Sequence, residues 1–179
     1  RSFAGALDTM SESQRYPPVP GHPDASLIVG VTGHRDLRAE EVPRLRGQVR
    51  DFFLALQRDY PGLPVSLLSP LAAGADQLVT SVAMELGLRV VAVLPVPLAM
   101  YREDFAAGEA RDEFDRQRAA ADVIELPILL SSSAQAVARA GHARDLQYAQ
   151  AGIFASTHCH ILLALWHGIL IKENHIAAA

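Results

Sequence analysis

The sequence predicts an α/β fold: a Rossmann-like, doubly wound and mostly parallel sheet of five or more strands, with helices on both faces. Two observations support this prediction. Short apolar segments alternate five times with helix-length segments, which is typical of successive βαβ units. The apolar segments are also nearly continuous, as in strands that are buried on both faces.

Composition favours one folded domain over residues 26–179. The chain has 179 residues, half of them hydrophobic and 20% charged, which is enough for a sizeable core. Residues 1–25 contain several prolines and are expected to form an extended or disordered leader. A net charge of −4 argues against broad charge-driven binding of nucleic acid. A single cysteine, no signal-peptide pattern and no membrane-spanning apolar run predict a cytoplasmic protein without a membrane partner.

The first half of the chain contains three of the expected strands. The first spans about 27–32 and precedes a helix that begins near Glu40 or Glu41 and ends at Tyr60. The second spans 65–69 and leads through a turn of small residues into a helix that stops at Gly87. The third spans 88–94 and ends at Pro95.

The second half is more polar. The charged segment 101–121 predicts an exposed helix that is broken near Gly108. A short fourth strand is expected over 122–126, and serines 131–133 form a loop and a helix cap. The next helix is expected over about 134–155, with Gly141 and Gly152 as the places where it would break. The fifth strand is expected over 160–166.

The turn after the first strand is the first candidate binding element, because ligands of such sheets lie at the carboxyl ends of the strands. Thr32 supplies a hydroxyl, and Gly33 allows a ligand to approach the backbone. His34 follows, and the guanidinium of Arg35 suits a phosphate. The plainer interpretation is a tight turn whose arginine pairs with a surface carboxylate.

The turn after the second strand is the second candidate. Around Ala73 and Gly74 the side chains are small, so the amides at the start of the following helix would be free to hold an anion. Asp76 has three open roles: a helix cap, an acceptor for a ribose hydroxyl, or a partner for Arg35. The plainer interpretation is close packing of the helix on the sheet.

Further candidates lie near the C-terminal part of the chain. Arg144 and Tyr148 are one helical turn apart and so share a face, where they would clamp a phosphate and stack on a base. The plainer interpretation is a surface arginine that lies over a half-buried tyrosine. Trp166 and Gly168 follow the last strand and would border the ligand. The run His158–His160 has a metal-like composition but no nearby carboxylate, so no metal and no catalytic residue is assigned.

Three motifs together resemble the SLOG superfamily, which includes the DprA/Smf DNA-processing proteins and the LOG cytokinin-activating phosphoribohydrolases. They are Val-Thr-Gly-His-Arg at 31–35, Ser-Pro-Leu-Ala-Ala-Gly-Ala-Asp at 69–76, and Val-Ala-Val-Leu-Pro at 91–95. The second is similar to a Ser-Gly-(small)-Ala-x-Gly-Ile-Asp signature of the DprA branch. The resemblance implies a nucleotide-binding domain. Its phosphate end would be Gly33, His34 and Arg35, its second wall Gly74 and Asp76, and its far edge Trp166 and Gly168.

The sequence departs from the pattern of LOG enzymes at one point. LOG enzymes carry a Pro-Gly-Gly-x-Gly-Thr loop and a catalytic glutamate after the last strands, and no such loop follows Trp166 here. The domain either is cut short at this point or lacks that phosphate cradle. We therefore expect a non-catalytic sensor of a nucleotide or nucleotide-derived ligand, as implied for bacterial signalling and defence domains of this superfamily. A fused or associated effector domain would be its partner, no cofactor beyond that ligand is assigned, and homo-oligomerisation stays open.

Two alternatives stay open. A LOG-like hydrolase of a nucleotide N-glycosidic bond would need a carboxylate in the pocket, for which Asp76 and Glu103 are the candidates. A DprA-like single-stranded DNA-binding protein would need a basic surface, which the arginines at 44, 46, 50 and 58 would supply only if they cluster. The charge balance makes nucleic acid the less favoured partner.

Overall fold

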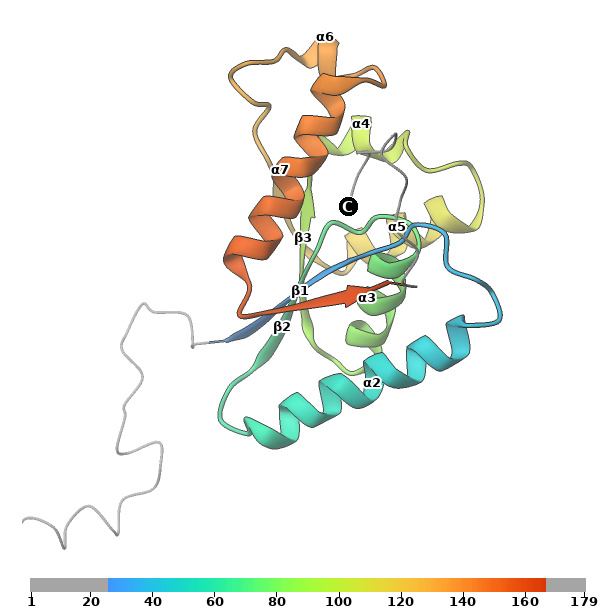
Figure 1. The fold of residues 1–179 in the computed structure, drawn as a ribbon, viewed down its shortest axis with the longest axis vertical. Coiled ribbons are helices and arrows are strands. Elements are labelled where there is room, and N and C mark those ends of the chain that lie inside the picture. Colours follow the sequence, from blue (N-terminus) through green and yellow to red (C-terminus); the bar gives the residue numbers. More distant parts are fainter. Residues whose placement is uncertain (1–25, 167–179) are drawn as a thin grey trace, which may run out of the picture.

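The computed structural model describes residues 26–166 and places five strands in one sheet (Figure 1). The strands are β1 (Leu27–Gly33), β2 (Val65–Ser69), β3 (Arg89–Leu94), β4 (Asp122–Glu125) and β5 (Ile161–Leu165). Their order is β4-β3-β2-β1-β5, and every neighbouring pair is parallel. The first four strands progress in one direction, and β5 returns to the other side of β1. The predicted α/β architecture is confirmed, and its strand order reverses between β1 and β5.

Helices cover both faces of this sheet. They are α2 (Val42–Asp59), α3 (Ala75–Glu85), α4 (Leu98–Arg102), α5 (Glu109–Ala119), α6 (Ala134–Val137) and α7 (His142–His158). Helices α2 and α3 pack together on one face, with α5 against α3, while α7 lies on the opposite face against β1 and β3 (Figure 1). Right-handed crossovers explain this division, because the connection to β5 runs in the opposite direction to the first three.

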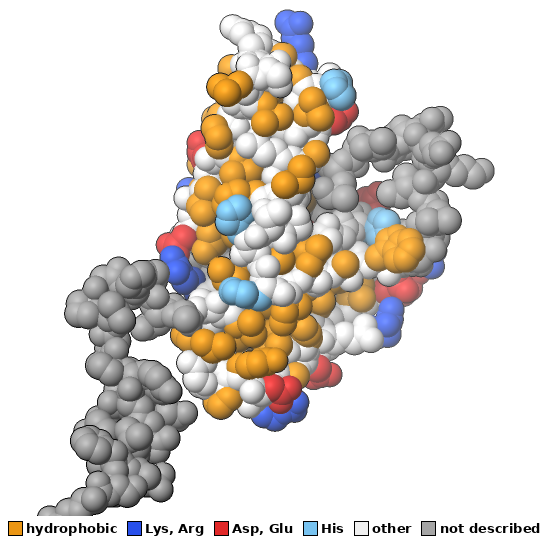
Figure 2. Space-filling model, turned by 60° about the vertical axis from the view of Figure 1, so that its left-hand side comes forward, with side chains coloured by type: hydrophobic (Ala, Val, Ile, Leu, Met, Phe, Trp, Pro, Cys, Tyr) orange, Lys and Arg blue, Asp and Glu red, His pale blue; other side chains and the backbone are white. Residues whose placement is uncertain are grey.

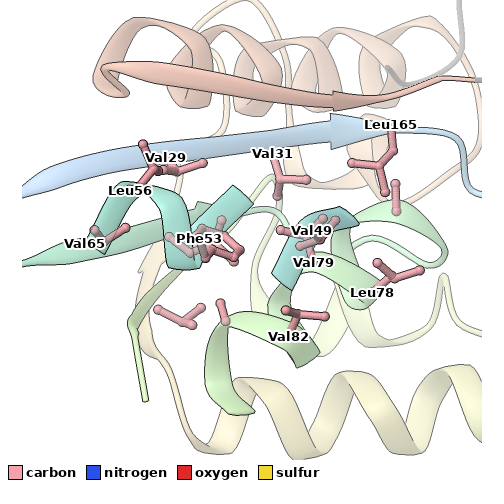
Figure 3. Close-up of a cluster of buried hydrophobic side chains, with 14 residues drawn as sticks. Val29, Val31, Val49, Phe53, Leu56, Val65, Leu78, Val79, Val82 and Leu165 are labelled. Atoms are coloured by element: carbon pink, nitrogen blue, oxygen red, sulfur yellow. The ribbon is translucent and has the colours of Figure 1, made fainter. Parts of the chain in front are cut away.

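Two apolar layers flank the sheet. On the α2–α3 face, Val29 and Val31 of β1 point toward Phe53 of α2 and Val79 of α3 (Figure 3). On the other face, strand residues such as Val93 pack against α7. In Figure 2, where the α7 side comes forward, hydrophobic side chains are visible over much of this face. Burial on both sides agrees with the continuous apolar character of the central strands.

The structure confirms two expected breaks and corrects the boundaries around them. The charged segment is broken before α5, which starts after Gly108 at φ +119°, and the short α4 already begins at Leu98. The helix expected over 134–155 is broken at Gly141, whose φ is +140°, into α6 and α7. Helix α7 is not broken at Gly152, and it continues to His158. At Gly108 and Gly141 the positive φ is incompatible with a continuous right-handed helix.

Two expectations concern parts of the chain that the structure does not describe. The leader proposed for residues 1–25 and the ligand contact proposed for Gly168 both lie outside the described residues. Over residues 26–166, no helix combines the length and apolar character needed to cross a bilayer.

Candidate ligand-binding site

A cavity of about 260 Å³ lies at the carboxyl ends of β1, β2 and β3, beside the reversal of strand order. Sequence reasoning places candidates at this edge, and five of them line the cavity: Thr32, Gly33, Arg35, Asp76 and Tyr148. Sites for small molecules typically measure about 300–1,000 Å³. The cavity is slightly smaller than this range, so it suits one part of a ligand, such as a sugar or base, with the rest of a larger ligand at its mouth.

The two candidate turns touch each other, backbone against backbone. The amide of Ala75 donates a hydrogen bond of 3.0 Å to the carbonyl oxygen of His34. Gly74 has a φ of +83°, and a Cβ atom there would lie 2.2 Å from the carbonyl oxygen of Arg35. A Cβ atom on Gly33 would lie 2.5 Å from that of Ala75. Glycine is required at these positions because the turns approach each other so closely.

Four amides of these turns bind other groups of the protein, so they are not free for an anion. The amides of Ala75 and Gln77 donate to the carbonyls of His34 and Ala72, and the His34 amide donates to Leu165. The Ala72 amide donates to Asp76 at 3.2 Å. Ala73 and Gly74 lie outside the cavity, in an adjoining open hollow. A backbone cradle therefore does not account for anion binding in the cavity, and a side-chain cation is needed.

Arg35 supplies that cation. Its side chain is exposed and lines both the cavity and the adjoining hollow. Its guanidinium carbon lies 5.3 Å from the centre of the Tyr148 ring. No described carboxylate forms an ion pair with Arg35, whereas Arg46 and Arg50 of α2 both pair with Glu85. The planar donor groups of Arg35 are thus available to a phosphate or carboxylate of a ligand.

Tyr148 is held in place by a polar cluster that sequence reasoning interpreted differently. Arg144 is buried and donates to both carboxylate oxygens of Asp104 at 2.6 Å and to the Val137 carbonyl at 2.5 Å. The Tyr148 hydroxyl also donates to Asp104. Arg144 does not line the cavity. It acts on the site through Asp104, which orients the ring that lines the cavity.

Asp76 is the titratable carboxyl group in the cavity wall. It is 6% exposed, and its Oδ2 atom accepts the hydrogen bond from the Ala72 amide. Burial raises the pKa of Asp76 to about 7, although the Ala72 amide and the charge of Arg35 act in the opposite direction. Burial in an apolar wall disfavours the ionised form of a carboxyl group.

Tyr101 stands beside Asp76 in the same wall. Its hydroxyl donates to the Pro70 carbonyl at 3.0 Å, and its ring packs edge-on against Phe105 and Phe114. Burial, and next the negative charge of Asp76, raise the pKa of Tyr101 far above its ordinary value. Tyr101 is therefore a neutral structural wall of the cavity at physiological pH.

Two other candidate residues lie elsewhere. His34 and Trp166 border a separate hollow of about 50 Å³ next to the start of α2. Trp166 is 61% exposed. Neither lines the main cavity, so a ligand there would not contact both Tyr148 and Trp166.

The run His158–His160 forms the connection between α7 and β5. His158 ends α7, and the ring Nδ1 of His160 accepts a hydrogen bond of 3.0 Å from the Ile28 amide. Within residues 26–166, no three His, Cys, Asp or Glu side chains come together in a way that could hold a metal ion.

Sequence reasoning found Tyr148 but missed the small residues of α7 that also line the cavity. Ala151, Gly152 and Ala155 line the cavity next to Tyr148. Their small side chains recur at helical spacing after Tyr148, and this was the available signal. A helix face with small residues leaves space between α7 and the end of β1, where larger side chains would fill the cavity.

Comparisons with known proteins give a likeness among solved structures. No family model and no curated protein matches this sequence. Among solved structures, the chain is similar to DNA processing protein A (DprA) from Streptococcus pneumoniae, with a TM-score of 0.49 and 14% sequence identity. The alignment covers 79% of this chain and 41% of that protein, so the chain corresponds to less than half of its length.

Proposed function

We propose that the cavity binds a nucleotide or nucleotide-derived ligand, with the anionic group of the ligand at Arg35. The observation that carries this proposal is the position of Arg35. It is a cation without a described carboxylate partner, at the mouth of a cavity where the strand order reverses. In doubly wound sheets this is the place where ligands bind.

The walls of the cavity suit the remainder of such a ligand. The Tyr148 ring, over which the guanidinium groups of Arg35 and Arg144 lie, gives the wall an aromatic surface for a base, and the α7 residues beside it are small. We propose that binding serves sensing, as the SLOG resemblance implies. A fused or associated effector domain would then respond to the bound state.

Titration calorimetry with AMP, ADP and ADP-ribose tests the proposal. Arg35→Ala should weaken the affinity of a bound nucleotide about 10- to 100-fold, because a charge-assisted contact contributes about 1.5–3 kcal/mol. The matched control is Arg38→Ala, which removes an exposed cation three residues away and outside the cavity. That variant should bind like the unmodified protein.

Two results would contradict this function. One is the absence of binding by every nucleotide tested, including at millimolar concentration. The other is an equal loss of affinity in Arg35→Ala and Arg38→Ala, which would mean that general electrostatic attraction, and not a site at Arg35, holds the ligand.

Asp76 favours a second candidate function, cleavage of a nucleotide N-glycosidic bond. A carboxyl group with a pKa near 7 is suited to donate a proton to a departing base. The other candidate carboxylate, Glu103, lies outside the cavity and is 70% exposed. Incubation of the protein with AMP, followed by chromatography for free adenine and ribose 5-phosphate, tests this candidate. Intact AMP after prolonged incubation would exclude it for this nucleotide.

The alternative of single-stranded DNA binding finds no support on α2. Arg46 and Arg50 converge, but they do so on Glu85 of α3. Arg44 pairs with Glu41, and Arg58 pairs with Asp59. These arginines are largely neutralised by carboxylates, so they do not form the basic surface that the DNA hypothesis requires.

A further inference from the structure

We propose that Asp76 determines the specificity of the cavity by accepting a hydrogen bond from the ribose 2′-hydroxyl of the ligand. This inference rests on the proposed function and goes beyond it, because it names the sugar as the part of the ligand that enters the cavity. It also selects one of the three roles that the sequence leaves open for Asp76.

The other two roles do not agree with the geometry. The N-cap position of α3 belongs to Gly74, and Asp76 lies two residues further along, with no side-chain cap bond at the N-cap. Asp76 forms no ion pair with Arg35 or with any other described cation. Its single described hydrogen bond is the one from the Ala72 amide, 3.2 Å long, which leaves Oδ1 without a partner in the described part of the chain.

A carboxyl group that is nearly buried and accepts a single hydrogen bond loses much of the hydration that it would have in water, which destabilises the fold. Asp76 is 6% exposed, and it lines a cavity instead of packing against other side chains on every side. A ligand that donates a hydrogen bond into the cavity would give this carboxyl group a second hydrogen-bond partner.

The arginine and the carboxyl group of the cavity suit different parts of a nucleotide. Arg35 lies at the mouth and is exposed, so it suits the phosphate, while Asp76 lies in the wall. Carboxylates accept hydrogen bonds and repel phosphates, so the group near Asp76 must be a donor such as a hydroxyl. Tyr148 then remains for the base. The exocyclic amine of a base is also a donor, and the experiment must therefore separate sugar from base.

Titration calorimetry with AMP, 2′-deoxy-AMP and IMP on the unmodified protein separates these donors. We expect AMP to bind about tenfold or more tightly than 2′-deoxy-AMP, because the deoxy sugar leaves the carboxylate unpaired. IMP, which lacks the exocyclic amine but keeps the ribose, should bind like AMP. This comparison requires no variant and so does not depend on the folding of one.

Variants then assign the discrimination to Asp76. Asp76→Asn retains an oxygen for the Ala72 amide and should reduce the ratio of AMP to 2′-deoxy-AMP affinity toward one. The matched control Asp36→Asn makes the same chemical change in an exposed turn residue outside the cavity, and it should leave the ratio unchanged.

The ratio of AMP affinity to 2′-deoxy-AMP affinity should also depend on pH. The groups that act on Asp76 are Arg35 from the β1–α2 turn, the Ala72 amide from the β2–α3 turn and Tyr101 of α4. Because an ionised carboxylate is the stronger acceptor, the preference for AMP should increase as the pH rises through about 7. The phosphate is common to both ligands, so its repulsion by Asp76 cancels in the ratio.

The outcomes separate this inference from the proposed function. Equal binding of AMP and 2′-deoxy-AMP would overturn the ribose contact and leave the nucleotide site intact. Weak binding of IMP with equal binding of the two adenine nucleotides would assign the donor to the base and also overturn it. If none of the three nucleotides binds, the proposed function fails and this inference fails with it.

Discussion

At the scale of one residue, the burial that places the carboxyl group of Asp76 in the cavity wall also lowers the stability of the fold at neutral pH. Its pKa is raised from 3.8 to about 7 by burial. Between these two values the folded protein binds the proton more strongly than the unfolded chain does. The contribution of this residue to stability therefore decreases as the pH rises from about 4 to about 7, and it stays at its minimum above pH 7.

Asp76→Asn should consequently raise the free energy of unfolding more at pH 8 than at pH 5. The asparagine is neutral at both pH values, so the difference reflects the cost of ionising Asp76 inside the fold. Since one pKa unit corresponds to about 1.4 kcal/mol, the gain at pH 8 should exceed that at pH 5 by up to ~3 kcal/mol. Urea denaturation of the ligand-free protein at the two pH values measures this difference, with Asp36→Asn as the control. An equal effect at both pH values would show that Asp76 does not have a raised pKa.

At the scale of elements, the turns that follow β1 and β2 contact each other at Gly74. This glycine has a φ of +83°, and its α-carbon faces the carbonyl of Arg35. Gly74→Ala should therefore destabilise the fold in two ways: through a left-handed backbone angle and through displacement of the turn that carries Arg35. We expect a loss of at least ~3 kcal/mol in the free energy of unfolding.

Two other glycines provide the controls for this prediction. Gly87 has a φ of +71° with open space around it, so Gly87→Ala isolates the backbone cost, about 1–2 kcal/mol. Gly47 lies inside α2 with nothing within 4 Å of its added Cβ atom, so Gly47→Ala should stabilise by about 0.5–1 kcal/mol. Denaturant unfolding of the three variants measures the change in the free energy of unfolding that each substitution causes. If Gly74→Ala and Gly87→Ala cost the same, the close contact between the turns is unimportant.

The elements also show what could be read from the sequence. Strand β2 has the bounds 65–69 that its apolar run predicts, because Pro64 and Pro70 delimit it. The spacing of Arg144 and Tyr148 correctly places them on one helix, α7. The partner that decides the role of Arg144 is Asp104, 40 residues earlier. Helical spacing contains no information about such a distant contact, so the predicted phosphate clamp is instead a support for Tyr148.

At the scale of the whole molecule, the parallel sheet explains why the candidate residues meet. All five strands point the same way, so the turns after β1, β2 and β3 lie at one edge. Because β5 returns beside β1, α7 covers the face opposite α2 and α3 (Figure 1). This arrangement follows from the alternation of strands and helices, which the sequence shows. The alternation does not show which amides at this edge are free: the Ala75 amide is used by the carbonyl of His34 in the neighbouring turn.

The same topology predicts where a bound nucleotide should slow amide hydrogen exchange. With AMP at saturating concentration, protection should increase in segments 32–35, 70–76, 98–104 and 144–152, which form or support the cavity. It should stay unchanged in segments 60–64 and 86–88, which precede β2 and β3 at the opposite edge of the sheet. Exchange followed by mass spectrometry resolves these segments, and Arg35→Ala under the same conditions controls for non-specific stabilisation. Uniform protection of both edges would mean that AMP stabilises the whole fold without occupying this cavity. Protection confined to 60–64 would place the ligand at the wrong end of the strands.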